Sequence, residues 1–175
     1  IMYLLQQLNA REIPLCLLFN RMNHLRPISR FFALISRLGN GVFWYCLILA
    51  LPLLHGSLGI QAALHMLLVG GVGVLIYKLL KSKTHRVRPY HYHSSILQNV
   101  AALDQFSFPS GHTLHAVSFT WIALHYFPQY ALVLIPFAGL VALSRVILGL
   151  HYPSDVLMGA LLGAGLAQAS LQWML

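Results

Sequence analysis

Long apolar runs constrain this chain more than any other feature of its sequence. The run over residues 60–80 holds a single charged side chain, Lys78. A helix that crosses a bilayer needs about 20 predominantly apolar residues. Only 8% of the residues are charged and 58% are hydrophobic, whereas soluble domains carry about 25% charged residues. The pattern therefore excludes an ordinary soluble domain and predicts an integral membrane protein.

Turn signals divide the apolar sequence into about five expected spans. Residues tolerant of turn conformations interrupt the runs at 36–41, 55–59 and 128–129. Backbone polar groups inside a bilayer must be satisfied within the segment, which favours helices. We therefore expect an all-α integral membrane helical bundle with about five transmembrane helices, in one domain over residues 1–175. The expected helices cover residues 42–54, 60–80, 113–127, 130–148 and 156–173.

The first 30 residues contain no apolar stretch long enough to cross a bilayer, because polar residues interrupt them. Leu15, Leu18, Phe19 and Met22 recur at helical spacing. We expect an N-terminal amphipathic region (residues 1–30) of one or two helices in the membrane interface; a poorly ordered terminus is the alternative. The opening residues lack a basic start and a small-residue cleavage site, so we expect no cleavable signal peptide.

Polar stretches gather on one side of the expected bundle. Residues 81–112 form the one long polar segment, and loops of this length in compact domains are usually functional or disordered. A second polar stretch, residues 144–155, joins the last two expected helices. Counting helices puts both stretches on the same membrane side, with only short turns on the other. One face of the bundle therefore carries the candidate site.

Three cationic side chains, Lys81, Arg88 and Arg145, belong to these stretches. Three cations around one point match a tetrahedral dianion such as phosphate, and at the edge of a low-dielectric bundle they would repel one another unless an anion lay between them. Ser110 and Gly111 precede an expected helix, so their backbone N–H groups can point at phosphate oxygens. Interfacial snorkelling of the cations and a plain turn capped by Ser110 are the structural alternatives.

Two histidines and a carboxylate complete the candidate site. Asp155 follows His151 by four residues, so after a helix start near Pro153 its carboxylate can accept the proton on one imidazole nitrogen. The other nitrogen is then free as a nucleophile or base. His112, at the start of an expected helix, can protonate a leaving alkoxide. A helix-capping Asp155 beside interfacial side chains is the alternative.

The same residues form three motifs that resemble those of the type 2 phosphatidic acid phosphatase superfamily. Its signatures are Lys-x6-Arg-Pro, Pro-Ser-Gly-His and Ser-Arg-x5-His-x3-Asp. The chain matches them without a mismatch at residues 81–89, 109–112 and 144–155. The resemblance does not clearly reach residues 1–30.

The resemblance implies a metal-independent membrane lipid phosphatase without a cofactor. His151 would be the nucleophile that forms a phosphohistidine, Asp155 would orient it, and His112 would be the general acid. The implied phosphate-binding residues are Lys81, Arg88, Ser110, Gly111 and Arg145. The three acidic residues of the chain, Glu12, Asp104 and Asp155, are scattered along it, and we expect only Asp155 in the site. Two-metal hydrolysis would need several carboxylates.

Undecaprenyl diphosphate, phosphatidylglycerophosphate and phosphatidic acid are the candidate substrates, each arriving from the bilayer. A lipid phosphotransferase that uses the same residues is the alternative enzyme, and a membrane protein that only binds anionic lipid is the non-enzymatic alternative. The net charge of +8 lies beside the expected spans. We therefore expect anionic lipid, and not nucleic acid, as its partner.

Membrane orientation receives conflicting signals. All eleven Lys and Arg residues fall on the motif side if residues 1–30 lie there, and the positive-inside rule would put that side in the cytoplasm. Bacterial family members that this chain resembles usually work on the outer face of the inner membrane. Since the chemistry needs at least three of these charges, we expect a bacterial inner-membrane protein with its site on the periplasmic face.

Overall fold

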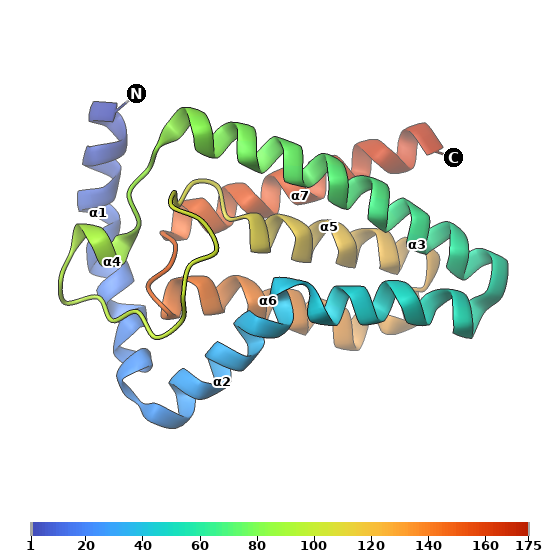
Figure 1. Cartoon of the computed structure of the whole chain (residues 1–175), viewed down its shortest axis with the longest axis horizontal. Coiled ribbons are helices and arrows are strands. Elements are labelled where there is room, and N and C mark those ends of the chain that lie inside the picture. Colours follow the sequence, from blue (N-terminus) through green and yellow to red (C-terminus); the bar gives the residue numbers. More distant parts are fainter. Residues whose placement is uncertain (1, 175) are drawn as a thin grey trace.

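Helices make up nearly all of the computed structural model, which describes residues 2–174 (Figure 1). The described residues contain no β-strand, so the all-α prediction is confirmed. The elements in chain order are α1 (Met2–Asn20), η1 (Arg21–His24), α2 (Arg26–Arg37), η2 (Leu38–Val42), α3 (Phe43–Thr84), α4 (Pro89–Tyr92), α5 (Gly111–Tyr126), η3 (Pro128–Tyr130), α6 (Ala131–Ile147) and α7 (Pro153–Met174).

Helix α3 folds back on itself at Gly56. The backbone there has φ 57° and ψ −131°, a conformation that glycine adopts readily because it lacks a Cβ. The two arms of α3 run in opposite directions and spread apart with distance from the kink (Figure 1). The turn expected at residues 55–59 is therefore present as one sharp kink inside a continuous helical element.

Helix α5 lies at the centre of the bundle, in contact with α3, α6 and α7 (Figure 1). Two glycines of α7 allow its close approach to α5. A Cβ added at Gly159 would lie 2.5 Å from the carbonyl oxygen of Ser110, and one at Gly163 would clash with the carbonyl of Leu114. Small residues at such crossings let helix backbones pack closely inside membranes.

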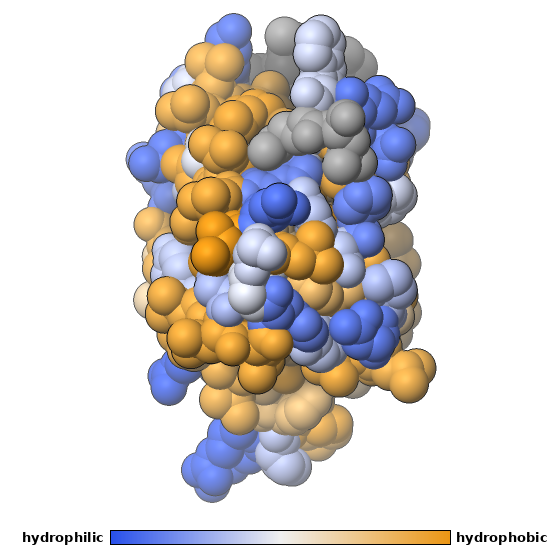
Figure 2. All heavy atoms as spheres, turned by 90° about the vertical axis from the view of Figure 1, so that its right-hand side faces the viewer, coloured by the Kyte–Doolittle hydropathy of each residue, from blue (hydrophilic) through white to orange (hydrophobic). Residues whose placement is uncertain are grey.

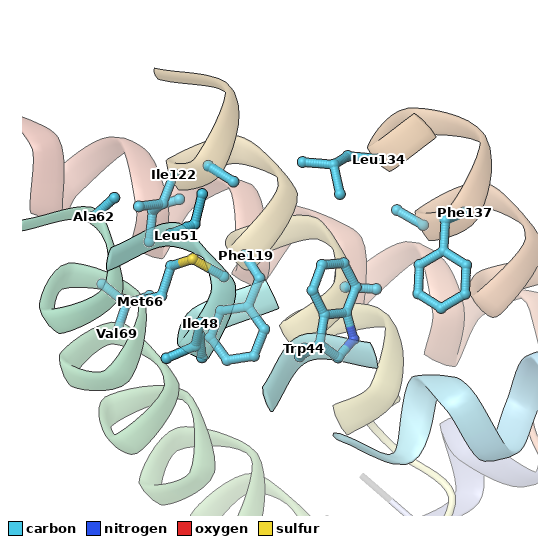
Figure 3. Packing of buried hydrophobic residues seen from close by; sticks show 14 of the residues in the cluster. Trp44, Ile48, Leu51, Ala62, Met66, Val69, Phe119, Ile122, Leu134 and Phe137 are labelled. Carbon is cyan, nitrogen blue, oxygen red and sulfur yellow. The ribbon is translucent and has the colours of Figure 1, made fainter. Parts of the chain in front are cut away.

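Aromatic side chains fill the core where α3, α5 and α6 meet (Figure 3). The ring centroid of Trp44 lies 5.5 Å from those of both Phe119 and Phe137. Met66, from the second arm of α3, joins the same cluster. Tilted and edge-on ring pairs of this kind pack favourably, so this cluster fixes the first arm of α3 against α5 and α6.

Large apolar side chains also cover the outside of the bundle. Leu53 is 86% exposed and Leu132 is 89% exposed, and faces of this kind mark contact with a membrane or a partner. Seen from the end with the tight turns, much of the surface is apolar (Figure 2). Within residues 2–174, three helical stretches are long and apolar enough to cross a membrane: Arg26–Tyr92, Pro128–Ile147 and Pro153–Trp173.

These findings agree with a membrane protein. The first of the three stretches contains both arms of α3, so it accounts for two of the expected spans. Helix α5 has only 16 residues, and the number of five spans stays a prediction.

Helix α1 crosses the end of the bundle that carries the polar segment (Figure 1). Its last residue, Asn20, donates through its amide to the carbonyl oxygens of Leu97 and Ile147, both at 2.9 Å. Helix α2 begins shortly after η1, at Arg26, and packs against α6. The N-terminal region is thus helical, and its place in the membrane interface stays a prediction.

The polar segment expected over residues 81–112 begins on a helix. Because α3 continues to Thr84, Lys81 lies in its last turn, and His85 ends the helix with φ 47°. The irregular parts of the segment are residues 85–88 and 93–110, on either side of α4.

Candidate active site

Four parts of the chain meet at the end of the bundle that α1 crosses: the end of α3, the segment that follows it, the start of α5, and the α6–α7 junction (Figure 1). In the junction, Gly149 has φ 72° and the N–H of His151 donates to the carbonyl of Arg145 at 3.0 Å. The N–H of Ser110 donates to the carbonyl of Asp155, also at 3.0 Å. These backbone bonds bring the second and third motifs together, and Arg88 of the first motif joins them by donating through Nη1 to the carbonyl oxygen of Leu150 at 2.6 Å.

His151 lies beside Asp155, as their spacing predicts. Its Nδ1 is 3.5 Å from Oδ2 of Asp155, slightly longer than a normal hydrogen bond. Nδ1 has no hydrogen-bond partner among the described residues. Oδ2 also accepts the N–H of Tyr152 at 2.9 Å. Both side chains are buried, so the carboxylate is placed to orient the imidazole.

Arg88 indicates which nitrogen of His151 faces the pocket. Its Nη1 lies 3.3 Å from Nε2, and a guanidinium can only donate. Nε2 is therefore the acceptor, and the proton belongs on Nδ1, towards Asp155. Burial, together with the charges of Arg88 and Arg145, lowers the pKa of His151 well below its ordinary value. His151 accordingly presents an unprotonated Nε2 at neutral pH.

Asp104 holds two of the cations at the pocket. Lys81 donates to its two carboxylate oxygens at 2.7 and 2.8 Å, and Arg88 donates through Nη2 to Oδ1 at 2.7 Å. Burial opposes ionisation of Asp104, but the hydrogen bond and charge of Lys81 and the charge of Arg88 outweigh it, so its pKa is lowered. The anion expected between the cations is thus partly supplied by the protein.

Arg145 is buried at the same end of the bundle, 1% exposed. One of its Nη groups donates to the hydroxyl of Ser36. Its Nε has no hydrogen-bond partner among the residues that the structure describes. A buried donor left without a partner is costly, and a guanidinium N–H is well suited to an anionic oxygen. Arg145 therefore has a buried donor without a partner, but it is absent from the described lining of the cavity that contains His151.

His112 is the second residue of α5 and contacts the side-chain oxygen of Asn40, which lies in η2. Because an amide oxygen only accepts, this contact requires a proton on Nε2 of His112. Gly111 and His112 both line the pocket.

Ser110 lies outside the pocket lining. Its hydroxyl lies 2.9 Å from Oγ1 of Thr113, and it caps α5. Its N–H donates to the carbonyl oxygen of Asp155, and its hydroxyl accepts the N–H of Thr113, so both groups are engaged within the protein. The cap, which was the structural alternative for this residue, is what the structure contains.

A cavity of about 710 Å³ connects the polar groups with an apolar cleft. The cleft lies between the two arms of α3, with Trp44 and Ile48 on one side, Leu67 and Val74 on the other, and Phe119 of α5 between them. The polar end of the cavity is lined by Lys81, Arg88, Asp104, His112 and His151. A molecule with an anionic head and an apolar body matches this division.

The expectation that only Asp155 among the acidic residues lies at the site is wrong. Asp104 pairs with Lys81 and Arg88, and Glu12 lies 3.0 Å from Arg86, which also contacts Asp155. The fold brings together three carboxylates that are far apart in the sequence. Within residues 2–174, no three His, Cys, Asp or Glu side chains are grouped to hold a metal ion.

Sequence reasoning missed Asp104, Arg86, Glu12 and Asn40 as members of this region. Arg86 offered a signal, because it lies two residues before Arg88 inside the first motif. The other three follow no motif spacing. Their places depend on how the loop, α1 and η2 fold against the motifs.

Comparison with known proteins finds relatives over most of the chain. The model of the PAP2 superfamily matches residues 62–175. A lipid A 1-phosphatase of Rhizobium johnstonii is 36% identical over 94 residues, which are 51% of this chain and 38% of that protein. A decaprenylphosphoryl-5-phosphoribose phosphatase of Mycobacterium tuberculosis is 39% identical over 119 residues, which are 63% of each chain. The chain thus matches less than two thirds of the length of either relative.

A solved structure agrees with the fold. The crystal structure of a transmembrane PAP2-type phosphatidylglycerolphosphate phosphatase from Bacillus subtilis superposes with a TM-score of 0.73 at 26% identity. The superposition covers 96% of this chain and 85% of that one. The similarity therefore includes α1 and α2, beyond the residues that the family model matches.

Proposed function

Because this chain belongs to the PAP2 superfamily, we propose that it is a membrane phosphatase that removes a terminal phosphate from a lipid. The proposal depends chiefly on the unprotonated Nε2 of His151, which faces Arg88 at the polar end of a cavity that continues into a mainly apolar cleft. The family match supports the reaction class, and the apolar walls support a substrate that arrives from the bilayer.

The reaction has two steps. Nε2 of His151 attacks phosphorus while the bond to the leaving oxygen breaks, and His112 gives its proton to that oxygen. Asp155, whose Oδ2 faces the protonated Nδ1, stabilises the positive charge that develops on the imidazole. In the second step His112 takes a proton from water as the water oxygen attacks phosphorus, and inorganic phosphate leaves with His151 restored.

Lys81, Arg88 and Arg145 bind the phosphoryl oxygens in this proposal, and the N–H of Gly111 adds a backbone donor at the start of α5. Negative charge spreads over the equatorial oxygens in the transition state of phosphoryl transfer, so fixed donors there lower the barrier. The unpaired Nε of Arg145 supports its part. Ser110 shapes the loop instead, since its hydroxyl caps α5.

The substrate carries its phosphate on a long apolar body. Undecaprenyl diphosphate, phosphatidylglycerophosphate and phosphatidic acid share this plan. Two relatives are named for lipid A and for decaprenylphosphoryl-5-phosphoribose, and these names support a lipid without choosing among the three. Lateral entry between the arms of α3 would bring the head group to His151 while the tail stays in the apolar cleft.

The protein would work in the bacterial inner membrane with its site on the periplasmic face. Bacterial relatives support the bacterial membrane. Four cations at this end are buried in the site region: Lys81, Arg86, Arg88 and Arg145. Their positions are explained by the chemistry of the site, so they carry no information on the membrane orientation.

Phosphate release by the detergent-purified protein in EDTA tests the proposal. We expect the wild type to release phosphate from at least one of the three lipids, and His151→Ala to release none. His91→Ala, the same change at an exposed histidine of α4, is the matched control and should keep its activity. Full activity of His151→Ala would overturn the role of His151, and phosphate transferred only to an added lipid alcohol would favour the phosphotransferase.

A further inference from the structure

A buried arginine contacts the candidate nucleophile pair from behind the pocket. Arg86 is 2% exposed and is absent from the described lining of the cavity that holds His151. Its Nη1 donates to Oδ1 of Asp155 at 2.6 Å and to the hydroxyl of Ser154 at 2.7 Å. Its guanidinium carbon lies 4.0 Å from the ring centroid of Tyr152. Bonds this short, under a stacked ring, hold the guanidinium in one orientation.

Two residues of α1 bind the other side of Arg86. Its Nη2 donates to Oε1 of Glu12 at 3.0 Å, and its Nε donates to Oδ1 of Asn9 at 2.9 Å. Glu12 also accepts the N–H of Ser154 at 2.9 Å and its hydroxyl at 2.7 Å. The family model begins only at residue 62. A helix outside the three motifs therefore reaches the residues that surround Asp155.

The two oxygens of the Asp155 carboxylate have different partners. Oδ1 is bound by Arg86, while Oδ2 accepts the N–H of Tyr152 and faces Nδ1 of His151. The terminal torsion of an Asp side chain is broad, so the bond from Arg86 to Oδ1 acts together with the bond from the N–H of Tyr152 to Oδ2 to stop the carboxylate from turning away. A buried carboxylate without a cationic partner also favours its protonated form.

Glu12 completes the charge balance of this group. One guanidinium between two carboxylates leaves a net negative charge, so Asp155 keeps its ability to accept from the imidazole. If Glu12 were neutral, Arg86 would be paired with Asp155 alone and would offset its charge. The negative charge of Glu12 on α1 therefore affects the His151 imidazole through Arg86 and Asp155.

We propose that Arg86 and Glu12 are positioning residues for the His151–Asp155 pair, and that α1 is through Glu12 a part of the catalytic unit. The inference rests on the proposed function, because it assigns a task to Asp155. Neither residue touches the substrate. If Glu12 and Arg86 served only to anchor α1, their loss would change stability and leave the catalytic step of the folded protein unaltered.

Glu12→Gln is the most direct test, because it removes the charge and keeps the shape. In steady-state phosphate release from the lipid that the wild type prefers, we expect kcat to fall about tenfold and KM to change by less than about twofold. Glu12→Asp keeps the charge and should recover part of the lost kcat. Arg11→Gln removes the neighbouring exposed charge of the same helix and should match the wild type.

Wild type and His151→Ala belong in the same assay. Wild-type kcat in folded Glu12→Gln overturns the positioning role while the phosphatase stands, and so does a loss that Glu12→Asp does not relieve. No release by the wild type from any lipid phosphate removes both proposals. If Glu12→Gln does not fold, as judged by size-exclusion chromatography, Arg86→Lys replaces it. That variant keeps the positive charge but cannot make the separate bonds by which Arg86 holds Asp155 and Glu12, and an unchanged kcat would equally overturn the inference.

Discussion

The Asp104 carboxylate is hydrogen-bonded to two of the cations that we propose bind phosphate. Asp104 accepts from Lys81 and Arg88, and it is 39% exposed at its side chain, so it can move aside. A substrate dianion must compete with it for the same donors. Asp104 therefore lowers the affinity for phosphate while keeping the two cations together.

Asp104→Asn should tighten phosphate binding. The amide keeps the shape but removes a negative charge beside the dianion, so we expect the inhibition constant for inorganic phosphate to fall by about threefold to tenfold. The melting temperature without phosphate should fall, because Lys81 and Arg88 then repel each other without a carboxylate between them. Weaker inhibition by phosphate would show that Asp104 mainly organises the cations.

His151 should make stability depend on pH. Its pKa is lowered, mainly by burial, so the unfolded chain, with an ordinary histidine pKa of about 6.5, binds a proton that the folded protein excludes. Below that pH the free energy of unfolding falls as pH falls, by up to about 1.4 kcal/mol per pH unit. His151→Asn removes this titration, so its melting temperature should fall less than that of the wild type between about pH 7 and pH 5. Equal changes in the two proteins would contradict the expectation.

At the scale of the helices, the packing of α7 on α5 sets the position of His112. A Cβ at Gly163 would clash with the backbone of Leu114, two residues after His112, whereas one at Gly165 would meet nothing within 4 Å. We expect Gly163→Ala to cost about 1–3 kcal/mol of stability through overpacking. Gly165→Ala is the matched control on the same helix and should be neutral or stabilising by up to about 1 kcal/mol. Thermal unfolding in one detergent compares them, and equal melting temperatures would argue against close packing at Gly163.

The helices were predictable from the sequence because their causes are local. Apolar runs, and glycines such as Gly56 at their breaks, give each helix its bounds within a few residues. The motif spacing likewise predicted that His151 and Asp155 would lie side by side. Glu12 and Asp104 could not be assigned, because each acts on a residue more than a dozen positions away. Such contacts depend on how α1 and the loop pack, which no local pattern encodes.

At the scale of the whole molecule, the charge distribution and the chemistry favour opposite orientations. Of the eleven Lys and Arg residues, Lys81, Arg86, Arg88 and Arg145 are buried at the site region. The remaining seven are exposed, and by the positive-inside rule they still predict that this end of the bundle faces the cytoplasm. An outer-face site therefore has to be established against that prediction by experiment.

Single cysteines at the two ends of the bundle decide the orientation. Ser95 lies in the exposed segment beside the site, and Ser57 lies in the turn at the kink of α3, at the opposite end. Cys46 is exposed and has to be replaced by serine first, whereas Cys16 is buried. With a membrane-impermeant maleimide on intact spheroplasts, we expect Ser95→Cys to be labelled at once and Ser57→Cys only after the membrane is permeabilised. The reverse pattern would put the site in the cytoplasm. The seven exposed cations would then have reported the orientation correctly, and the substrate would have to present its phosphate on the inner leaflet.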